Sequence, residues 1–160
     1  MGMTWDGWAL TGAEASAVRA DPESIWERLN ADRTSPSAVD LDKAWHGIHW
    51  LLTGDPWTTE GPLASVIFGG EELDGNFGYG PPRLLDPSGV AAIAAALADV
   101  DPTTLRARFD PAAMASAEVY PDIWDDADSF AGYLAPNFVA VKEFYRAAAE
   151  RGQWVLQLLH

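Results

Sequence analysis

The sequence predicts an α+β fold: one compact domain, residues 1–160, in which several helices pack on a small, mostly antiparallel sheet. Two observations predict this class. Short aromatic and aliphatic stretches near both ends of the chain, residues 3–10 and 153–159, are typical of strands. Between them, Asp-Pro and Thr-x-x-Glu patterns are start signals for helices. Strands from both termini with helices between them indicate α+β, and no stretch is long enough to link two domains.

The first 40 residues contain one strand and two helices in this interpretation. Residues 3–10 form the strand, and Thr11 begins a capping box with Glu14, which predicts a helix to about residue 20. Asp21-Pro22 then starts a second helix, with Asp as N-cap and Pro at the first helical position. We expect three of its side chains to face inward: Ile25, Trp26 and Leu29. Residues 31–40 are predicted to be a loop.

Residues 41–54 are the stretch around which the domain is expected to form. Apolar residues recur there at spacings of three and four, which predicts a helix facing a core: Leu41, Ala44, Trp45, Ile48 and Leu52. Asp40 is the expected N-cap and Gly54 the expected C-terminal residue. Gly47 costs this helix roughly 1 kcal/mol relative to Ala, so its presence predicts a close neighbour.

The rest of the chain contains further signals for the beginning and end of helices and strands. A helix begins at Pro62 and ends at Gly69-Gly70, and residues 83–85 form a short strand. Three Asp-Pro pairs start further helices, at Asp86, Asp101 and Asp110. A long helix starts near Phe130, with a kink expected at Pro136, and ends near Gly152 before the final strand.

The chain is strongly acidic, with 24 Asp and Glu against 10 Lys and Arg and a formal net charge of −14. Such a charge repels nucleic acid and anionic membranes and favours a basic protein partner, although solubility alone also accounts for it. The chain has no cysteine, which excludes disulfides and thiolate chemistry. No signal peptide or apolar stretch of membrane-spanning length is present, so we expect a cytoplasmic protein. Composition leaves the oligomeric state open.

Asp42, His46 and His49 are the first candidates for chemistry, because they lie at i, i+4 and i+7 of the central helix. One interpretation is a carboxylate that orients an imidazole, or two imidazoles that hold a metal. The other is a capping Asp with histidines at the edge of the core that bond to backbone carbonyls. Further metal ligands are missing, so we expect neither a metal nor another cofactor.

Two further segments supply candidate ligand or partner residues. The glycine-rich loop 70–81 matches no phosphate-binding or dinucleotide motif, and Tyr79 and Arg83 flank its exit. The acidic stretch 118–128 does not fit an EF-hand, because it lacks the central Gly and the closing acid. With the central helix, the full candidate pocket comprises Asp42, Trp45, His46, His49, Tyr79, Arg83, Tyr120 and Asp122.

Several motifs together resemble the YfbM-like bacterial family, a domain of unknown function. They are the Met1-Gly2-Met3 start, Leu41-Asp42-Lys43-x-Trp45-x-x-x-His49, Glu118-x-Tyr120-Pro121 and Tyr145-Arg146 before Gly152. His49 fits that pattern. The resemblance implies a compact cytosolic α+β domain and implies no reaction.

Two functions follow from these observations. The first is a non-catalytic acidic interaction domain, of inhibitor or immunity type, that binds a basic protein. The second is a small-ligand-binding protein or hydrolase with a pocket around Asp42, His49 and Tyr120. The sequence names no nucleophile, so whether the chain is an enzyme stays open at this point.

Overall fold

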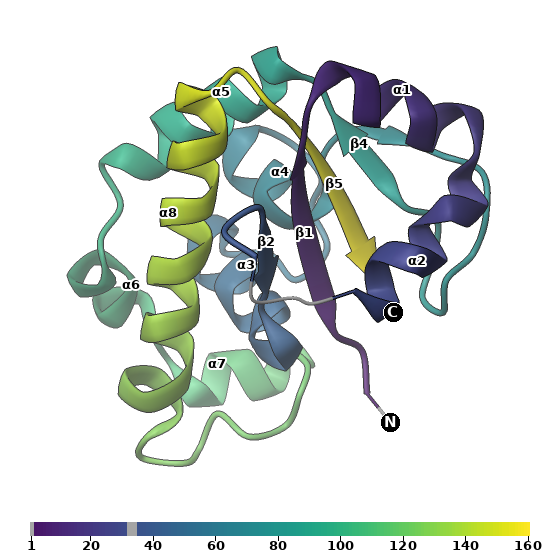
Figure 1. Cartoon of the computed structure of the whole chain (residues 1–160). Helices are drawn as coiled ribbons and strands as arrows, with labels where there is room; N and C mark the ends of the chain where they lie inside the picture. The colour runs from purple at the N-terminus through teal and green to yellow at the C-terminus, as the bar shows by residue number, and fades with distance from the viewer. Residues whose placement is uncertain (1, 32–34) are drawn as a thin grey trace.

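The computed structural model describes residues 2–31 and 35–160 and has the elements labelled in Figure 1. The helices are α1 (Gly12–Ala20), α2 (Ile25–Asn30), α3 (Trp45–Thr53), α4 (Pro62–Phe68), α5 (Pro87–Ala98), α6 (Pro102–Arg108), α7 (Pro111–Ser116) and α8 (Ala135–Glu150). The strands are β1 (Trp5–Leu10), β2 (Ala38–Asp40), β3 (Glu71–Glu72), β4 (Arg83–Leu85) and β5 (Trp154–Leu159). Single turns of 3₁₀-helix, Pro22–Ser24 and Asp42–Ala44, precede α2 and α3, and a π-helical turn, Ser129–Leu134, precedes α8.

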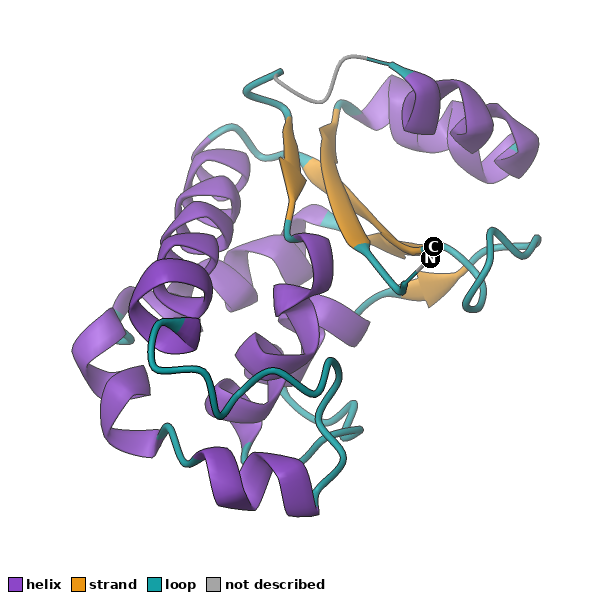
Figure 2. Ribbon diagram, turned by 90° about the horizontal axis from the view of Figure 1, so that it is seen from below, coloured by secondary structure: helices purple, strands orange, loops and turns teal. Residues whose placement is uncertain are grey.

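Within the described residues, five strands form one antiparallel sheet in the order β2-β1-β5-β4-β3. The first and last strands pair in its middle over six residues, from Trp5 opposite Leu159 to Leu10 opposite Trp154. Thr4 and His160 extend this ladder through their backbone groups, which places the two ends of the chain side by side (Figure 2). The α+β class with strands from both termini is therefore confirmed.

The sheet is covered on both faces, so all six residues of β1 are buried. Figure 2 shows α1 and α2 on one side and the larger group of helices on the other. Successive residues of a strand point to opposite faces of the sheet, so alternate residues pack into two separate hydrophobic cores. Trp8, Leu10 and Leu156 pack in the smaller core with α1 and α2. Trp5 and Val155 join the larger core with α3, α4, α5 and α8.

Helix α3 lies inside the larger core, and seven of its nine residues are buried. Gly47 is buried there because another helix and an indole press on it. A Cβ at this position would lie 2.7 Å from both Leu134 Cδ2 and Trp124 Cη2. Gly54 ends the helix in the left-handed conformation, with φ of 74°. The expected close neighbour and the expected helix end are both present.

Helix caps account for most of the predicted element boundaries. The Thr11–Glu14 capping box is formed in both directions. The carboxylates of Asp86, Asp101 and Asp110 each accept hydrogen bonds from backbone N–H groups in the first turn that follows. Asp21 differs, since its side chain makes no cap bond and a 3₁₀ turn separates it from α2.

Three predictions about elements were wrong in detail. The segment 31–40 contains the short strand β2, which pairs with β1. Trp26 was expected to face inward, yet 46% of its surface is exposed. Its ring lies at the surface against Phe77 of the 73–82 loop, with centroids 4.7 Å apart. The kink expected at Pro136 is replaced by the π-helical turn. Proline has no N–H to donate, so it is tolerated at the start of a helix and favours a break in the ladder before it.

No helix among residues 2–31 and 35–160 combines the length and the apolar character needed to cross a lipid bilayer.

Candidate functional site

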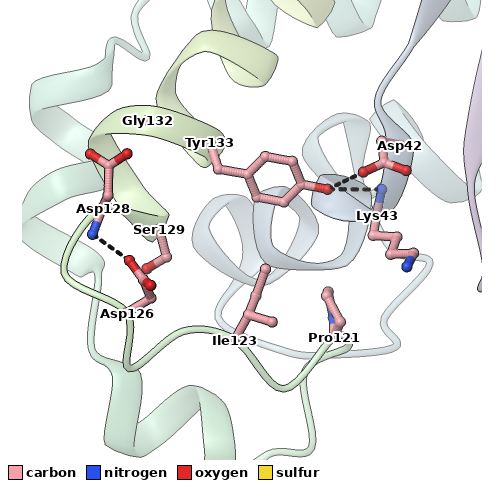
Figure 3. A pocket seen from close by; sticks show the side chains of 9 residues that line it. All are labelled: Asp42, Lys43, Pro121, Ile123, Asp126, Asp128, Ser129, Gly132 and Tyr133. Carbon is pink, nitrogen blue, oxygen red and sulfur yellow. Dashed lines mark hydrogen bonds between the residues drawn. The ribbon is translucent and has the colours of Figure 1, made fainter.

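A solvent-open depression of about 480 Å³ lies where three segments meet (Figure 3). The 3₁₀ turn before α3 supplies Asp42 and Lys43. The acidic stretch supplies Pro121, Ile123, Asp126 and Asp128, and the π-helical turn supplies Ser129, Gly132 and Tyr133. Figure 3 shows the Tyr133 ring lying across the depression, with the two acidic walls on opposite sides of it. The fold thus joins the start of the central helix to the acidic stretch.

Asp42 is held in an unusual backbone conformation. Its φ is 47°, in the left-handed region that few residues other than glycine adopt. Its N–H donates to Asp40 Oδ1 at 2.7 Å. The prediction that Asp40 is the N-cap was wrong, because Asp40 ends β2 and the N-cap of the turn is Leu41, which makes no side-chain cap bond. The Tyr133 hydroxyl donates to Asp42 Oδ2 at 2.7 Å. The carboxylate of Asp42 is therefore fixed at one wall of the depression.

Tyr133 connects two of the segments that form the depression, the π-helical turn and the 3₁₀ turn before α3. Its hydroxyl oxygen accepts a hydrogen bond from the Lys43 N–H at 3.0 Å while its proton is donated to Asp42. Burial, followed by the hydrogen bond to Asp42, raises the pKa of Tyr133 well above its ordinary value. The phenol is therefore neutral near pH 7 and acts as a donor.

The opposite wall carries Asp126 and Asp128. Asp126 Oδ1 accepts from the Asp128 N–H at 2.8 Å. Gly132 allows the Asp128 carboxylate to lie against the π-helical turn, because a Cβ there would come within 2.1 Å of Asp128 Oδ2. The depression is thus lined by three aspartates and one lysine. Nowhere in the described part of the chain do three or more His, Cys, Asp or Glu side chains converge closely enough to hold a metal ion.

Trp45 and His46 are buried and form a separate cluster with the partly buried Tyr120. The Trp45 and His46 rings stack with centroids 4.6 Å apart. His46 Nδ1 accepts from the Tyr120 N–H at 2.9 Å, so Nε2 carries the proton and donates to the Pro56 carbonyl at 2.8 Å. Burial lowers the pKa of His46, partly offset by the bond to Pro56. Both His46 partners are backbone groups, as in the second of the two interpretations drawn from the sequence, and Asp42 does not orient the His46 imidazole.

His49 is sealed in the core. It is 0% exposed, and neither ring nitrogen has a hydrogen-bond partner among residues 2–31 and 35–160. The Phe68 ring packs edge-on against it at 4.8 Å. Burial, followed by repulsion from His46, lowers the pKa of His49 to about 4, so the ring is neutral at pH 7. The structure does not bring His49 together with Asp42 and Tyr120.

The remaining predicted residues lie elsewhere. Tyr79 and Arg83 line a second, smaller pocket next to β5, and Arg83 pairs with Glu72. Asp122 is exposed on the loop between Pro121 and Ile123, which both line the depression. The eight predicted residues are thus divided among four places: the depression and its rim, the cluster of Trp45, His46 and Tyr120, the core position of His49, and the smaller pocket.

The comparisons with known proteins bear on the fold and the family. A family model described as a domain of unknown function (DUF1877) matches residues 1–158. The chain belongs to the DUF1877 family. This DUF1877 chain is also similar to the crystal structure of YfbM from Escherichia coli, described as a protein of unknown function. The TM-score is 0.74 at 21% sequence identity, over 98% of this chain and 99% of that chain, which shows a shared fold. No curated protein matches this chain.

Among the described residues that line the depression of this DUF1877 domain, only Asp42 was predicted, and the missed residues include Tyr133, Asp126 and Asp128. Tyr133 fits the apolar pattern of the long helix, so the sequence pattern predicts a core residue there and not a residue that lines the depression. Asp126 and Asp128 belong to an acidic stretch for which capping is the simpler interpretation. Gly132 was the available signal, because a glycine within a helical pattern indicates a close neighbour.

Proposed function

We propose that this chain is a non-catalytic interaction domain that binds a basic protein partner, of the kind that inhibitors and immunity proteins bind. The depression is the proposed contact surface. The observation that carries this proposal is its lining, where three aspartates and one lysine surround a phenol and an exposed isoleucine. Ile123 is 39% exposed. The excess of acidic residues over the whole chain would add long-range attraction for a basic partner.

The chemistry of the lining fits a lysine or arginine side chain. Such side chains combine an aliphatic stem with a cationic end, and the stem packs on apolar surface while the charge is solvated or paired. Ile123 and the Tyr133 ring offer the apolar surface, and Asp126 and Asp128 offer the carboxylates. The volume of about 480 Å³ accommodates one such side chain with part of its backbone.

The ionisable groups around the depression support binding more than reaction. Acid–base catalysis needs a titrating group within hydrogen-bond reach of the reacting atom, with a pKa near the working pH. Tyr133 is a neutral phenol whose hydroxyl is engaged with Asp42. His46 is bonded to backbone groups, and His49 is buried away from the depression.

A labelled pentapeptide tests this proposal. The probe is fluorescein-Gly-Leu-Lys-Leu-Gly, and the matched control peptide carries acetyl-lysine in place of lysine. Fluorescence anisotropy at 0.05 M and 0.3 M salt measures both affinities. We expect the lysine peptide to bind at least roughly tenfold tighter than the acetylated one at low salt, and to weaken as salt shortens the screening length.

Two double variants with the same change of net charge locate the binding surface. Asp126→Asn with Asp128→Asn removes two charges from the depression and keeps the amide oxygen that Asp128 N–H requires. Glu23→Gln with Glu27→Gln removes two exposed charges near α2, on the other side of the sheet. We expect only the first pair to weaken the lysine peptide, by roughly tenfold. Equal affinities for the two peptides, or equal losses in both variants, would refute the proposed surface.

A further inference from the structure

We propose a second ligand site in the smaller pocket beside β5, for a short branched carboxylate. The pocket has a volume of about 120 Å³. It is lined by Trp5, Ile67, Phe68, Tyr79, Pro81, Arg83, Gln157, Leu158 and Leu159. It shares no residue with the depression, and an aliphatic acid is chemically unlike the basic side chain proposed there.

The charge of this lining is opposite to that of the whole chain. Among the described residues, Arg83 is the only one of the Asp, Glu, Lys and Arg types in this lining, in a protein of net charge −14. The Arg83 side chain is 25% exposed, so most of its surface is covered by neighbouring residues. In the described part of the chain, its one side-chain hydrogen bond runs from Nη2 to Glu72. A guanidinium has five N–H donors, so it can bind a carboxylate in addition to Glu72.

Some polar side chains of the pocket wall already make hydrogen bonds within the protein, and others are free to bind a ligand. The Gln157 amide donates to the carbonyls of Ser65 and Val66 and to the Tyr145 hydroxyl, and it accepts from the Gly69 N–H. The Trp5 indole N–H donates to the Ile67 carbonyl. Tyr79 is half exposed, and its hydroxyl makes no hydrogen bond to another described residue. Tyr79 and Arg83 are therefore the groups left to recognise a ligand.

The glycine-rich loop explains how Tyr79 comes to line the pocket. Gly78 and Gly80 flank Tyr79, and both have positive φ, 135° and 117°. Gly78 lies against the backbone of His160, where a Cβ would be 3.3 Å from its Cα. The loop can therefore lie close to the end of β5, which brings Tyr79 to the same pocket as Arg83.

The size and lining together select the ligand class. An engineered apolar cavity of about 150 Å³ holds benzene, so about 120 Å³ suits a body of about four or five carbon atoms. The apolar walls favour a branched aliphatic body, and Arg83 favours an anionic end. The probe that combines both is 3-methylbutanoate.

The test measures binding of 3-methylbutanoate by nuclear magnetic resonance, following the Trp5 indole and the Tyr79 and Arg83 amides. Its neutral analogue 3-methylbutanamide and the oversized adamantane-1-carboxylate are the comparison probes. We expect the acid to bind at least roughly tenfold tighter than the amide, because a charge-assisted hydrogen bond is about twice as strong as a neutral one. We expect it also to bind more tightly than adamantane-1-carboxylate, whose body is too large for a pocket of about 120 Å³.

Two variants separate ligand binding from a purely structural ion pair. Arg83→Gln and Glu72→Gln both remove the Arg83–Glu72 pair, so a structural role predicts the same result for both. The proposal predicts opposite results: Arg83→Gln weakens 3-methylbutanoate at least roughly tenfold, and Glu72→Gln keeps or tightens it, because the guanidinium loses a competing carboxylate. If Arg83→Gln fails to fold, Glu72→Gln and Tyr79→Phe still test the site, and Tyr79→Phe is expected to weaken binding several-fold.

Three results would overturn the proposal. They are no shift of the three signals with 3-methylbutanoate in the unaltered protein, equal binding of acid and amide, and parallel losses in Arg83→Gln and Glu72→Gln.

Discussion

Replacing His49 by Leu is expected to remove a stability loss in mild acid. His49 is 0% exposed, and in the part of the chain that the structure describes neither ring nitrogen has a hydrogen-bond partner, so the fold disfavours its protonated form. Its pKa falls from 6.5 to about 4 in the folded chain. The unfolded chain therefore binds more protons between these two values. The contribution of His49 is constant above about pH 6.5 and becomes unfavourable as pH falls towards about 4.

The magnitude follows from the size of the shift. One pKa unit corresponds to about 1.4 kcal/mol, so a shift from 6.5 to about 4 amounts to about 3 kcal/mol once the pH is below both values. At pH 5 the same linkage relation gives about 2 kcal/mol of lost stability. Leucine is close in volume to histidine and has no polar atoms, so His49→Leu should fold and should be at least as stable at pH 7.

The assay is urea denaturation of both proteins from pH 8 to pH 5, followed by tryptophan fluorescence. The difference in free energy of unfolding between them isolates His49 from the other titrating groups. We expect this difference to be constant between pH 8 and pH 7 and to change by about 2 kcal/mol in favour of the variant by pH 5. Curves that stay parallel down to pH 5 would refute the argument that a buried, unpaired imidazole controls this window.

Three further substitutions test the packing, the caps and the depression by denaturation. Gly47→Ala should destabilise by about 1–3 kcal/mol because its methyl group meets two side chains at 2.7 Å, whereas Gly12→Ala, with its nearest neighbour at 3.9 Å, should be neutral or stabilising. Thr11→Ala should cost about 1 kcal/mol through the lost capping box, and Asp21→Ala, whose side chain makes no cap bond, should cost clearly less. Tyr133→Phe should lower the free energy of unfolding by about 1–2 kcal/mol, because it removes the hydrogen bond to Asp42 and leaves the Lys43 N–H without its acceptor. An unchanged denaturation midpoint would contradict this expectation.

Local signals in the sequence predicted most element boundaries. Asp86, Asp101 and Asp110 begin helices because a carboxylate and the following proline act within one turn, without help from distant residues. Strand β2 was missed for the opposite reason. Its three residues are a strand only because β1 lies beside them, and that pairing is long-range.

The candidate site was predicted less well because one backbone angle broke the assumed helical register. Asp42 was placed on the same helical face as His46 and His49, but its φ of 47° lies outside any right-handed helix. Its carboxylate therefore meets Tyr133, about 90 residues later in the chain, instead of an imidazole. Pairs separated by that distance are set by tertiary packing, which residue spacing alone does not encode.

The pairing of β1 with β5 has a consequence for synthesis on the ribosome. The central ladder of the sheet joins residues that are about 150 positions apart, so it cannot form until β5 has left the exit tunnel. Until then, β1 exposes an edge rich in tryptophan and aliphatic side chains. A nascent chain stalled before residue 154 should therefore be a good chaperone substrate, and release of the last strand should end that dependence.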